Sequence, residues 1–204
     1  RWATLGAGLA AAGAVHPLDD NVDRWVDARP RSHATKAGAV FGSAAGQAVV
    51  VGAVLLPGTL DRCVSRFGYA LARAALVNAG LTSAVKYATY RERPNQEPAR
   101  VSFPSFHTSS TVALATVAQR RFGWKASLPA YGVAAYTGWS RVRDDKHWVS
   151  DTVFGASLGL AVGLAVTRMD RDAAWSIVPV ASRGGIGLAI VRAGDLTSGS
   201  PVSK

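Results

Sequence analysis

Cysteine is almost absent from this 204-residue sequence, which contains only Cys63. A disulfide within the chain needs two cysteines, so none can form, and a metal site built on cysteine ligands is excluded in the same way. Acidic residues are also scarce, with 13 Asp and Glu against 23 Lys and Arg, and the formal net charge is +10. This excess of positive charge favours an anionic partner: a phosphate ester, an acidic lipid headgroup or nucleic acid.

The sequence also lacks any motif for nucleic-acid binding, and its basic residues are scattered rather than clustered. Nucleic acid is therefore the least favoured of the three partners. Neither an internal repeat nor a low-complexity tract occurs, and the length suits one domain with its own core. Hydrophobic residues make up 49% of the chain, yet the mean hydropathy is only +0.13. This value lies between a soluble helical protein and a polytopic membrane protein.

The longest stretch without charge runs from Ala37 to Leu60, and we expect it to be the one run clearly long enough to cross a bilayer. Gly38, Gly42 and Gly46 recur in it at intervals of four residues. Small residues at this spacing form a stripe along a helix, and the stripe lets a second helix approach closely.

Further helices are predicted on both sides of this run, joined by short loops. They span residues 2–15, 62–90, 108–121, 126–139 and 152–167, with a short capped helix after Asp19. The helix over 152–167 repeats the glycine spacing at Gly155, Gly159 and Gly163. The pattern predicts an all-α, up-and-down bundle of about six helices.

The C-terminal part differs in kind from the bundle. Trp175–Ala181 and Ile186–Val191 are β-prone runs joined by a glycine-containing turn, which predicts a hairpin. Thr197–Pro201 is rich in Ser and Gly and predicts a flexible tail. We expect one domain, with the helical part over residues 1–172 and the peripheral hairpin and tail over 173–204.

The segment Ser140–Asp151 concentrates charge between two apolar runs. His147 and Asp151 are four residues apart, so on a helix they share a face and the carboxylate can hold the imidazole. The pairing fixes which ring nitrogen carries the proton and leaves the other free to attack or coordinate. Arg141 and Arg143 lie close by and can bind an anion. Taken alone, the segment is equally consistent with a charged loop between helices.

Lys86 and Arg93 form a second cationic site near the end of a predicted helix. They are seven residues apart, two helical turns, so both project from one face before Pro94 stops the helix. The alternative interpretation is a helix C-terminus decorated with cations, which is common.

A third segment places Ser105 directly before a helix. Ser105 can cap that helix, whose free backbone N–H groups then form a ready site for phosphate. His107 follows in the first turn, where a proton donor could reach a ligand held by those groups. The alternative is an ordinary helix cap with a chance histidine.

These three segments should meet at one end of the bundle, because the helices that carry them alternate in direction. The loops at the other end carry basic residues, and if the protein spans a membrane the positive-inside tendency places them in the cytoplasm and the anion site outside. The basic residues are Arg62, Arg66, Arg120, Arg121, Lys125, Arg168 and Arg171. The later helices are short for spanning, so this topology is a hypothesis.

The order and internal spacing of the three segments resemble the three-part signature of the type 2 phosphatidic acid phosphatase (PAP2) superfamily. This superfamily contains lipid phosphatases, bacterial acid phosphatases and vanadium-dependent haloperoxidases. The matching residues are Lys86-x6-Arg93-Pro94, Pro104-Ser105-Phe106-His107 and Ser140-Arg141-x5-His147-x3-Asp151. The resemblance implies a PAP2-type helical bundle.

The resemblance also implies a role for each matching residue. His147 would attack phosphorus to give a phosphohistidine, Asp151 would orient His147, and His107 would protonate the departing alkoxide and then help to activate water. The phosphoryl oxygens would be bound by Lys86, Arg93, Ser105, the backbone N–H of Phe106 and Arg141. Neither a metal nor another cofactor is implied.

Some positions depart from the signature or lie outside it. Phe106 stands where the family usually has glycine, which bears on substrate shape more than on chemistry. Loop-surface or substrate-rim positions are expected for Arg143, Asp144, Asp145 and Lys146, and a packing role for Trp148.

The leading interpretation is a phosphomonoesterase or diphosphatase of a bacterial-type envelope, acting on a phosphorylated lipid or isoprenoid at the membrane. A soluble periplasmic acid phosphatase for small esters is the alternative. A haloperoxidase with vanadate on His147 is disfavoured, because the resemblance implies much longer chains for those enzymes. A non-catalytic membrane protein that binds lipid headgroups would not need His107, His147 and Asp151 together. The sequence predicts neither the natural substrate nor the oligomeric state.

Overall fold

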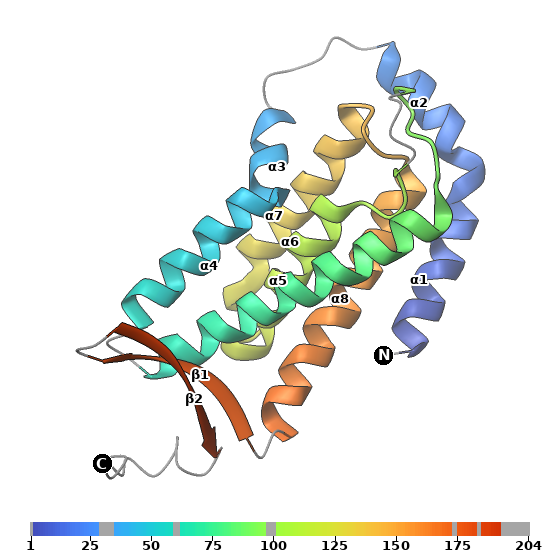
Figure 1. Ribbon diagram of the computed structural model, residues 1–204. Helices are drawn as coiled ribbons and strands as arrows, with labels where there is room; N and C mark the ends of the chain where they lie inside the picture. Colours follow the sequence, from blue (N-terminus) through green and yellow to red (C-terminus); the bar gives the residue numbers. More distant parts are fainter. Residues whose placement is uncertain are drawn as a thin grey trace.

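Helices dominate the computed structural model, which describes residues 2–28, 35–58, 62–96, 101–172, 175–182 and 185–192 (Figure 1). The predicted all-α bundle is confirmed. The helices are α1 (Trp2–Val15), η1 (His16–Leu18, a 3₁₀ helix), α2 (Asp19–Asp27), α3 (Thr35–Gly42), α4 (Ala44–Gly58), α5 (Arg62–Thr89), α6 (Phe106–Phe122), α7 (Trp124–Arg143) and α8 (Val149–Asp172).

The charge-free run forms two helices rather than one unbroken helix, although the two together remain long and apolar enough for a broken span or a re-entrant loop. α3 and α4 are bent by 62° at a break around Ser43. The Ser43 hydroxyl donates to the carbonyl of Val40 (2.8 Å) and accepts from the N–H of Gly46 (2.9 Å). At the break, these side-chain hydrogen bonds take the place of the regular backbone hydrogen bonds of a helix. Gly46 permits the bend, because a Cβ there would lie 2.0 Å from the Val40 oxygen.

Among the described residues, the helix that is by itself long and apolar enough to cross a membrane is α8, over Val149–Arg168. The expectation that the later helices are too short is therefore wrong for α8. Within the bundle 56% of its apolar window is buried, as in the core helix of a soluble protein. Length and hydropathy alone therefore do not distinguish a membrane helix from a core helix here.

Helix α6 is at the centre of the bundle, in contact with α3, α5, α7 and α8 (Figure 1). The predicted close approach along the second glycine stripe is present between α8 and α6. A Cβ on Gly155 would lie 2.8 Å from the carbonyl oxygen of Ser105, and one on Gly159 would lie 2.1 Å from that of Ser109. Below this contact the core is completed by Ala70, Leu71, Ala74, Ala113, Val117, Leu158, Val162 and Val166.

The C-terminal hairpin agrees with the prediction. Strands β1 (Trp175–Ser182) and β2 (Gly185–Arg192) pair antiparallel, with Trp175 opposite Arg192 and Ser182 opposite Gly185. The tail predicted at residues 197–201 lies outside the described part of the chain.

Candidate active site

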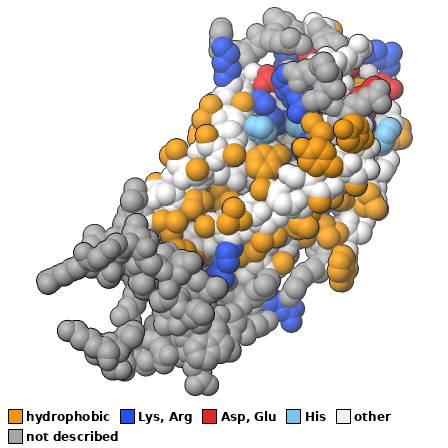
Figure 2. Space-filling view, viewed as in Figure 1, with side chains coloured by type: hydrophobic (Ala, Val, Ile, Leu, Met, Phe, Trp, Pro, Cys, Tyr) orange, Lys and Arg blue, Asp and Glu red, His pale blue; other side chains and the backbone are white. Residues whose placement is uncertain are grey.

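The end of α5, the start of α6, the end of α7 and the start of α8 meet at one end of the bundle, as expected from the order of the helices (Figure 1). The backbone N–H of Ser105 donates to the carbonyl of Asp151 (3.1 Å), and that of Asn95 donates to the carbonyl of Asp145 (3.3 Å). In Figure 2, Lys and Arg side chains and histidines gather at this end, above a flank with many hydrophobic side chains. The predicted cationic and histidine residues are thus brought together in space.

His147 and Asp151 face each other at the start of α8, and they are 4% and 0% exposed. Nδ1 of His147 lies 3.6 Å from Oδ2 of Asp151, slightly longer than a hydrogen bond. His147 precedes the first helical residue, Val149, so the pair spans the helix entrance and does not share a helical face. The same Oδ2 accepts from the backbone N–H of Trp148 (3.0 Å), which caps α8.

Burial lowers the pKa of the His147 imidazole, and the Asp151 carboxylate opposes that shift. The positive charges of Lys86 and Arg93 lower this pKa further. The ring is therefore neutral near pH 7. Because Nδ1 faces the carboxylate, a proton on Nδ1 leaves the lone pair of Nε2 free on the other side of the ring.

His107 is the second residue of α6, and its imidazole packs against Phe106 edge to face, with ring centroids 6.1 Å apart. The aromatic ring that replaces the family glycine therefore supports a histidine. Burial and the nearby charge of Arg141 lower the pKa of His107 to about 4. On the other side α3 comes very close, since a Cβ on Gly42 would lie 2.5 Å from the Cβ of His107.

Three of the predicted anion ligands are cations from two helices and the loop after α5. Lys86 donates to the backbone carbonyls of Val101 and Ser102, and burial together with Arg93 lowers its pKa to about 8. Arg141 is 6% exposed, and one of its terminal nitrogens pairs with Asp144 at 2.6 Å. Its buried Nε has no hydrogen-bond partner. An unsatisfied guanidinium N–H of this kind can bind an oxyanion.

The start of α6 supplies further donors, although not in the way predicted for Ser105. Ser105 is the N-cap residue, but its side chain makes no capping bond and instead accepts from the Thr108 hydroxyl (3.0 Å). Its own N–H is directed to Asp151. The first hydrogen bond of the helix runs from the N–H of Ser109 to the carbonyl of Ser105. The N–H groups of Phe106, His107 and Thr108 therefore have no acceptor within the helix and can bind an anion.

The loop between α7 and α8 is less exposed than predicted. Loop-surface or substrate-rim positions are expected for Arg143, Asp144, Asp145 and Lys146. None of the four is exposed, so the loop-surface interpretation is wrong, and the substrate-rim interpretation stays a prediction. Helix α2 covers the loop, and Arg143 donates to the carbonyl of Val26 at 2.9 Å.

Sequence reasoning missed three residues that bind the Asp151 carboxylate or its supports. Ser102 donates its hydroxyl to Oδ2 of Asp151, and Arg91 donates to Oδ1 at 2.7 Å. Arg91 also donates to Asp19, at the start of α2, at 2.8 Å. Arg91 lies between Lys86 and Arg93 in the sequence and could have been suspected from that position, whereas Asp19 had no local signal.

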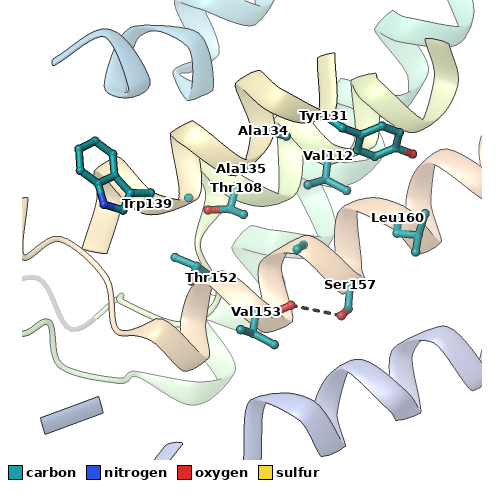
Figure 3. A pocket seen from close by; sticks show the side chains of 12 residues that line it. Thr108, Val112, Tyr131, Ala134, Ala135, Trp139, Thr152, Val153, Ser157 and Leu160 are labelled. Atoms are coloured by element: carbon teal, nitrogen blue, oxygen red, sulfur yellow. Dashed lines mark hydrogen bonds between the residues drawn. The ribbon is translucent and has the colours of Figure 1, made fainter. Parts of the chain in front are cut away.

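A groove of about 580 Å³ runs between α7 and α8, and Thr108 and Val112 of α6 also line it (Figure 3). None of the predicted catalytic or phosphate-binding residues lines the groove, but Thr108 and Thr152 directly follow His107 and Asp151 in the sequence, and Trp139 lies two residues before Arg141. Its wall on α8 extends from Thr152 to Leu160, about 12 Å at the helical rise of 1.5 Å per residue. Most of the lining side chains are small or apolar: Val112, Ala134, Ala135, Gly138, Val153, Ala156, Ser157 and Leu160, with Tyr131.

Within the described residues, no group of three or more His, Cys, Asp or Glu side chains is arranged to hold a metal ion.

Comparison with known proteins gives a family and a fold. The family model of the PAP2 superfamily matches residues 64–175. The chain is 39% identical over 87 residues to the lipid A 1-phosphatase of Porphyromonas gingivalis, a match covering 41% of this chain but only 19% of that protein's length. The fold is similar to that of a transmembrane PAP2-type phosphatidylglycerolphosphate phosphatase from Bacillus subtilis (TM-score 0.71, 19% identity, 83% of this chain, 95% of that one). It is also similar to LpxE from Aquifex aeolicus (TM-score 0.62, 20% identity, 74% of this chain, 95% of that one).

Proposed function

Because the chain belongs to the PAP2 superfamily, we propose that it is a phosphatase that hydrolyses a phosphorylated lipid or isoprenoid through a phosphohistidine on His147. One observation carries this proposal. The buried His147, the half-buried His107, the buried Asp151 carboxylate and the start of a helix with free N–H groups meet at one end of the bundle, beside cationic side chains.

The first step is attack by Nε2 of His147 on phosphorus. The phosphorus–nitrogen bond forms as the bond to the substrate alkoxide breaks, and a proton from His107 goes to the leaving oxygen. Asp151 stabilises the positive charge that develops on the His147 ring, because its Oδ2 lies 3.6 Å from Nδ1. The alcohol or monophosphate product then leaves.

In the second step water attacks the phosphohistidine. His107, now neutral, accepts a proton from this water as the phosphorus–nitrogen bond breaks. Inorganic phosphate is released and His147 returns to its neutral form. One histidine thus serves as acid in the first step and base in the second.

His107 is neutral in the free site, since its pKa of about 4 reflects burial and neighbouring cations. A substrate phosphate carries up to two negative charges into contact with those same cations. Its field offsets that of Arg141 and raises the pKa of His107, so the substrate itself favours the protonated acid that the first step requires.

The transferring phosphoryl group would be bound by donors that are already in place. They are Lys86, Arg93, Nε of Arg141 and the N–H groups at the start of α6. Fixed donors of this kind stabilise charge that develops in the transition state without a reorganisation cost. Ser105 stays in the proposed set through its hydroxyl.

The groove between α7 and α8 favours a lipid over a small ester. Two of its lining residues, Thr108 and Thr152, directly follow His107 and Asp151 in the sequence, and its lining is mostly apolar (Figure 3). A hydrocarbon chain of about eight carbons would fit its length. The names of two relatives, a lipid A 1-phosphatase and a phosphatidylglycerolphosphate phosphatase, specify lipid phosphates and support the same choice.

We place the protein in a bacterial cell envelope, with its active site at the outer face of the membrane. The end of the bundle opposite the site carries exposed arginines, including Arg66, Arg120 and Arg121, as expected for a cytoplasmic face. The side chains of Arg62 and Arg171 lie outside the described part of the chain.

A phosphate-release panel tests the substrate class. Purified protein in detergent is given lipid monophosphates, isoprenyl diphosphates and soluble monoesters, with His147→Ala as the matched control. We expect release from at least one lipid class, and inhibition by vanadate. Turnover of soluble esters alone would reject the lipid assignment in favour of a soluble-type acid phosphatase. Halide oxidation with added vanadate would favour the peroxidase alternative.

A further inference from the structure

Arg91 links two carboxylates that are far apart in the sequence. One terminal nitrogen of Arg91 donates to Oδ1 of Asp151 and to the hydroxyl of Ser150, both at 2.7 Å. The other donates to Oδ2 of Asp19 at 2.8 Å. A planar guanidinium can serve two carboxylates in this way because its donors point in fixed directions.

Asp19 also binds the start of α8 directly. Its Oδ1 accepts from the backbone N–H of Ser150 (3.0 Å), and its Oδ2 accepts from the Ser150 hydroxyl (2.5 Å). Ser150 is the second residue of α8, so its N–H has no acceptor within that helix. Asp19 is 3% exposed, and it therefore caps from α2 the helix that carries Asp151.

The Arg91 guanidinium also stacks on the ring of Trp148. It lies 5.5 Å from the centre of the Trp148 ring, and the indole N–H of Trp148 donates to the carbonyl of Glu92 at 2.9 Å. Stacking on an aromatic ring is favourable for a guanidinium and restricts its tilt. The direction of the donors towards Asp151 is thus determined by contacts on several sides.

We propose that Arg91 and Asp19 are positioning residues that hold the Asp151 carboxylate in place against His147. This inference rests on the proposed function of His147 and Asp151. Of the two oxygens of Asp151, Oδ1 is held by Arg91 and Oδ2 faces His147. Without Arg91, the carboxylate is held only through Oδ2, by Ser102 and the N–H of Trp148, and its plane can rotate relative to the imidazole.

The proposal gives the N-terminal helices a role in catalysis. Asp19 lies outside residues 64–175, the part of the chain that matches the family model. Helix α2 would thus contribute to the chemistry through Arg91, without contact with the substrate.

The test compares Asp19→Asn with Asp20→Asn. The two residues are adjacent in the first turn of α2, and both changes remove one negative charge, but Asp20 is exposed. We expect Asp19→Asn to lower kcat by roughly 10- to 100-fold, the usual range for a residue that orients a reacting group, with KM within about twofold. Asp20→Asn should keep both constants. Equal kcat for the two variants would overturn the proposal.

Arg91→Gln provides the second arm, combined with Asp19→Asn in a double-mutant cycle. If both act through the same carboxylate, the double variant should lose about as much kcat as the worse single variant. Losses that multiply would overturn the shared role. A raised KM with unchanged kcat would also overturn it, because Arg91 would then bind the substrate. Arg91→Lys keeps the positive charge but lacks the two terminal nitrogens that bind Asp151 and Asp19. Its kcat should therefore lie between those of the wild type and of Arg91→Gln.

Two controls keep these outcomes distinct. Thermal unfolding of each variant in the same detergent shows whether it is folded. If Arg91→Gln is not folded, the comparison of kcat between Asp19→Asn and Asp20→Asn still tests the proposal. Wild-type turnover that persists in His147→Ala would reject the proposed function itself. Turnover that depends on His147 but not on Asp19 would reject only the positioning role.

Discussion

Nδ1 of His147 and Oδ2 of Asp151 are separated by 3.6 Å, about half an ångström more than a good hydrogen bond. Buried Nδ1 has no other partner, and Oδ2 already accepts from Trp148 and Ser102. Attack on phosphorus by Nε2 makes the ring cationic and Nδ1 a stronger donor. A small shift of the ring then closes the contact, so the pair should tighten as the phosphohistidine forms.

His147→Ala should abolish phosphate release, with a fall in kcat of at least about 10³-fold, because the proposed nucleophile is lost. Rapid acid-free quenching with ³²P-labelled substrate should trap an acid-labile label on the wild type and none on the variant. Retained activity in a correctly folded His147→Ala protein would exclude the mechanism.

His107→Gln should lower kcat by roughly 10²- to 10⁴-fold for an alkyl phosphate, since the leaving alkoxide is then not protonated. With p-nitrophenyl phosphate, whose leaving group needs little protonation, the first step should be much less affected. The measurement is the size of the pre-steady-state burst of p-nitrophenol. Equal losses for both substrates would mean that His107 binds phosphate and is not an acid.

His107 should make the protein less stable in acid. Its pKa is about 4 in the folded state, against an ordinary value of 6.5 for histidine, so between these two pH values the unfolded chain binds the extra proton. Stability is therefore fully present above about pH 6.5 and falls as the pH drops towards 4, by up to about 3 kcal/mol.

Denaturation of the wild type and of His107→Gln at pH 7 and pH 5 tests this. The variant should lose less stability over that range. It should still lose some, because burial lowers the pKa of His147 in the same direction. An identical loss in both proteins would show that His107 does not contribute.

Ala135→Phe should raise KM for long-chain lipid phosphates and leave KM for a short soluble ester unchanged. Ala135 lines the groove, and the larger ring would displace part of the chain bound there. Displacing two methylene groups costs about 1.6 kcal/mol, a little over tenfold in affinity. Ala126→Phe, an exposed position of α7 outside the groove lining, is the matched control. An unchanged dependence on chain length would place the lipid chain elsewhere.

Gly159→Ala should destabilise the fold by roughly 1–3 kcal/mol, because its Cβ would lie 2.1 Å from the carbonyl oxygen of Ser109. The matched control is Gly132→Ala in α7, where nothing lies within 4 Å of the added Cβ. This control should stabilise the helix by up to about 1 kcal/mol. Thermal unfolding midpoints of the two variants should therefore move in opposite directions.

Local patterns were sufficient for most helices and for the residues of the site that share a short segment. The first helix was predicted with its observed bounds, Trp2–Val15, and α8 was predicted from its apolar and glycine spacing. His147 and Asp151 could be paired because they are four residues apart. The bend at Ser43 could not be predicted, because it depends on which backbone groups a single serine hydroxyl binds.

The support of Asp151 was missed for a different reason. Arg91 and Asp151 are 60 residues apart, and Asp19 and Ser150 are 131 residues apart. No spacing rule covers such pairs, and Asp19 reads as an ordinary acidic residue at the start of a helix. Only the packing of α2 over the α7–α8 loop brings it to the site.

The glycine contacts between α6 and α8 also determine how far apart the starts of these two helices lie. The N–H groups proposed to bind phosphate lie at the start of α6, and Asp151, proposed to orient His147, lies in the first turn of α8. The backbones of α6 and α8 are in contact at Gly155 and Gly159. If one helix moved along the other, a carbonyl oxygen of α6 would clash with a backbone atom of α8. The spacing between the start of α8 and the N–H groups at the start of α6 is thus set by main-chain atoms, so side-chain motion would leave it unchanged.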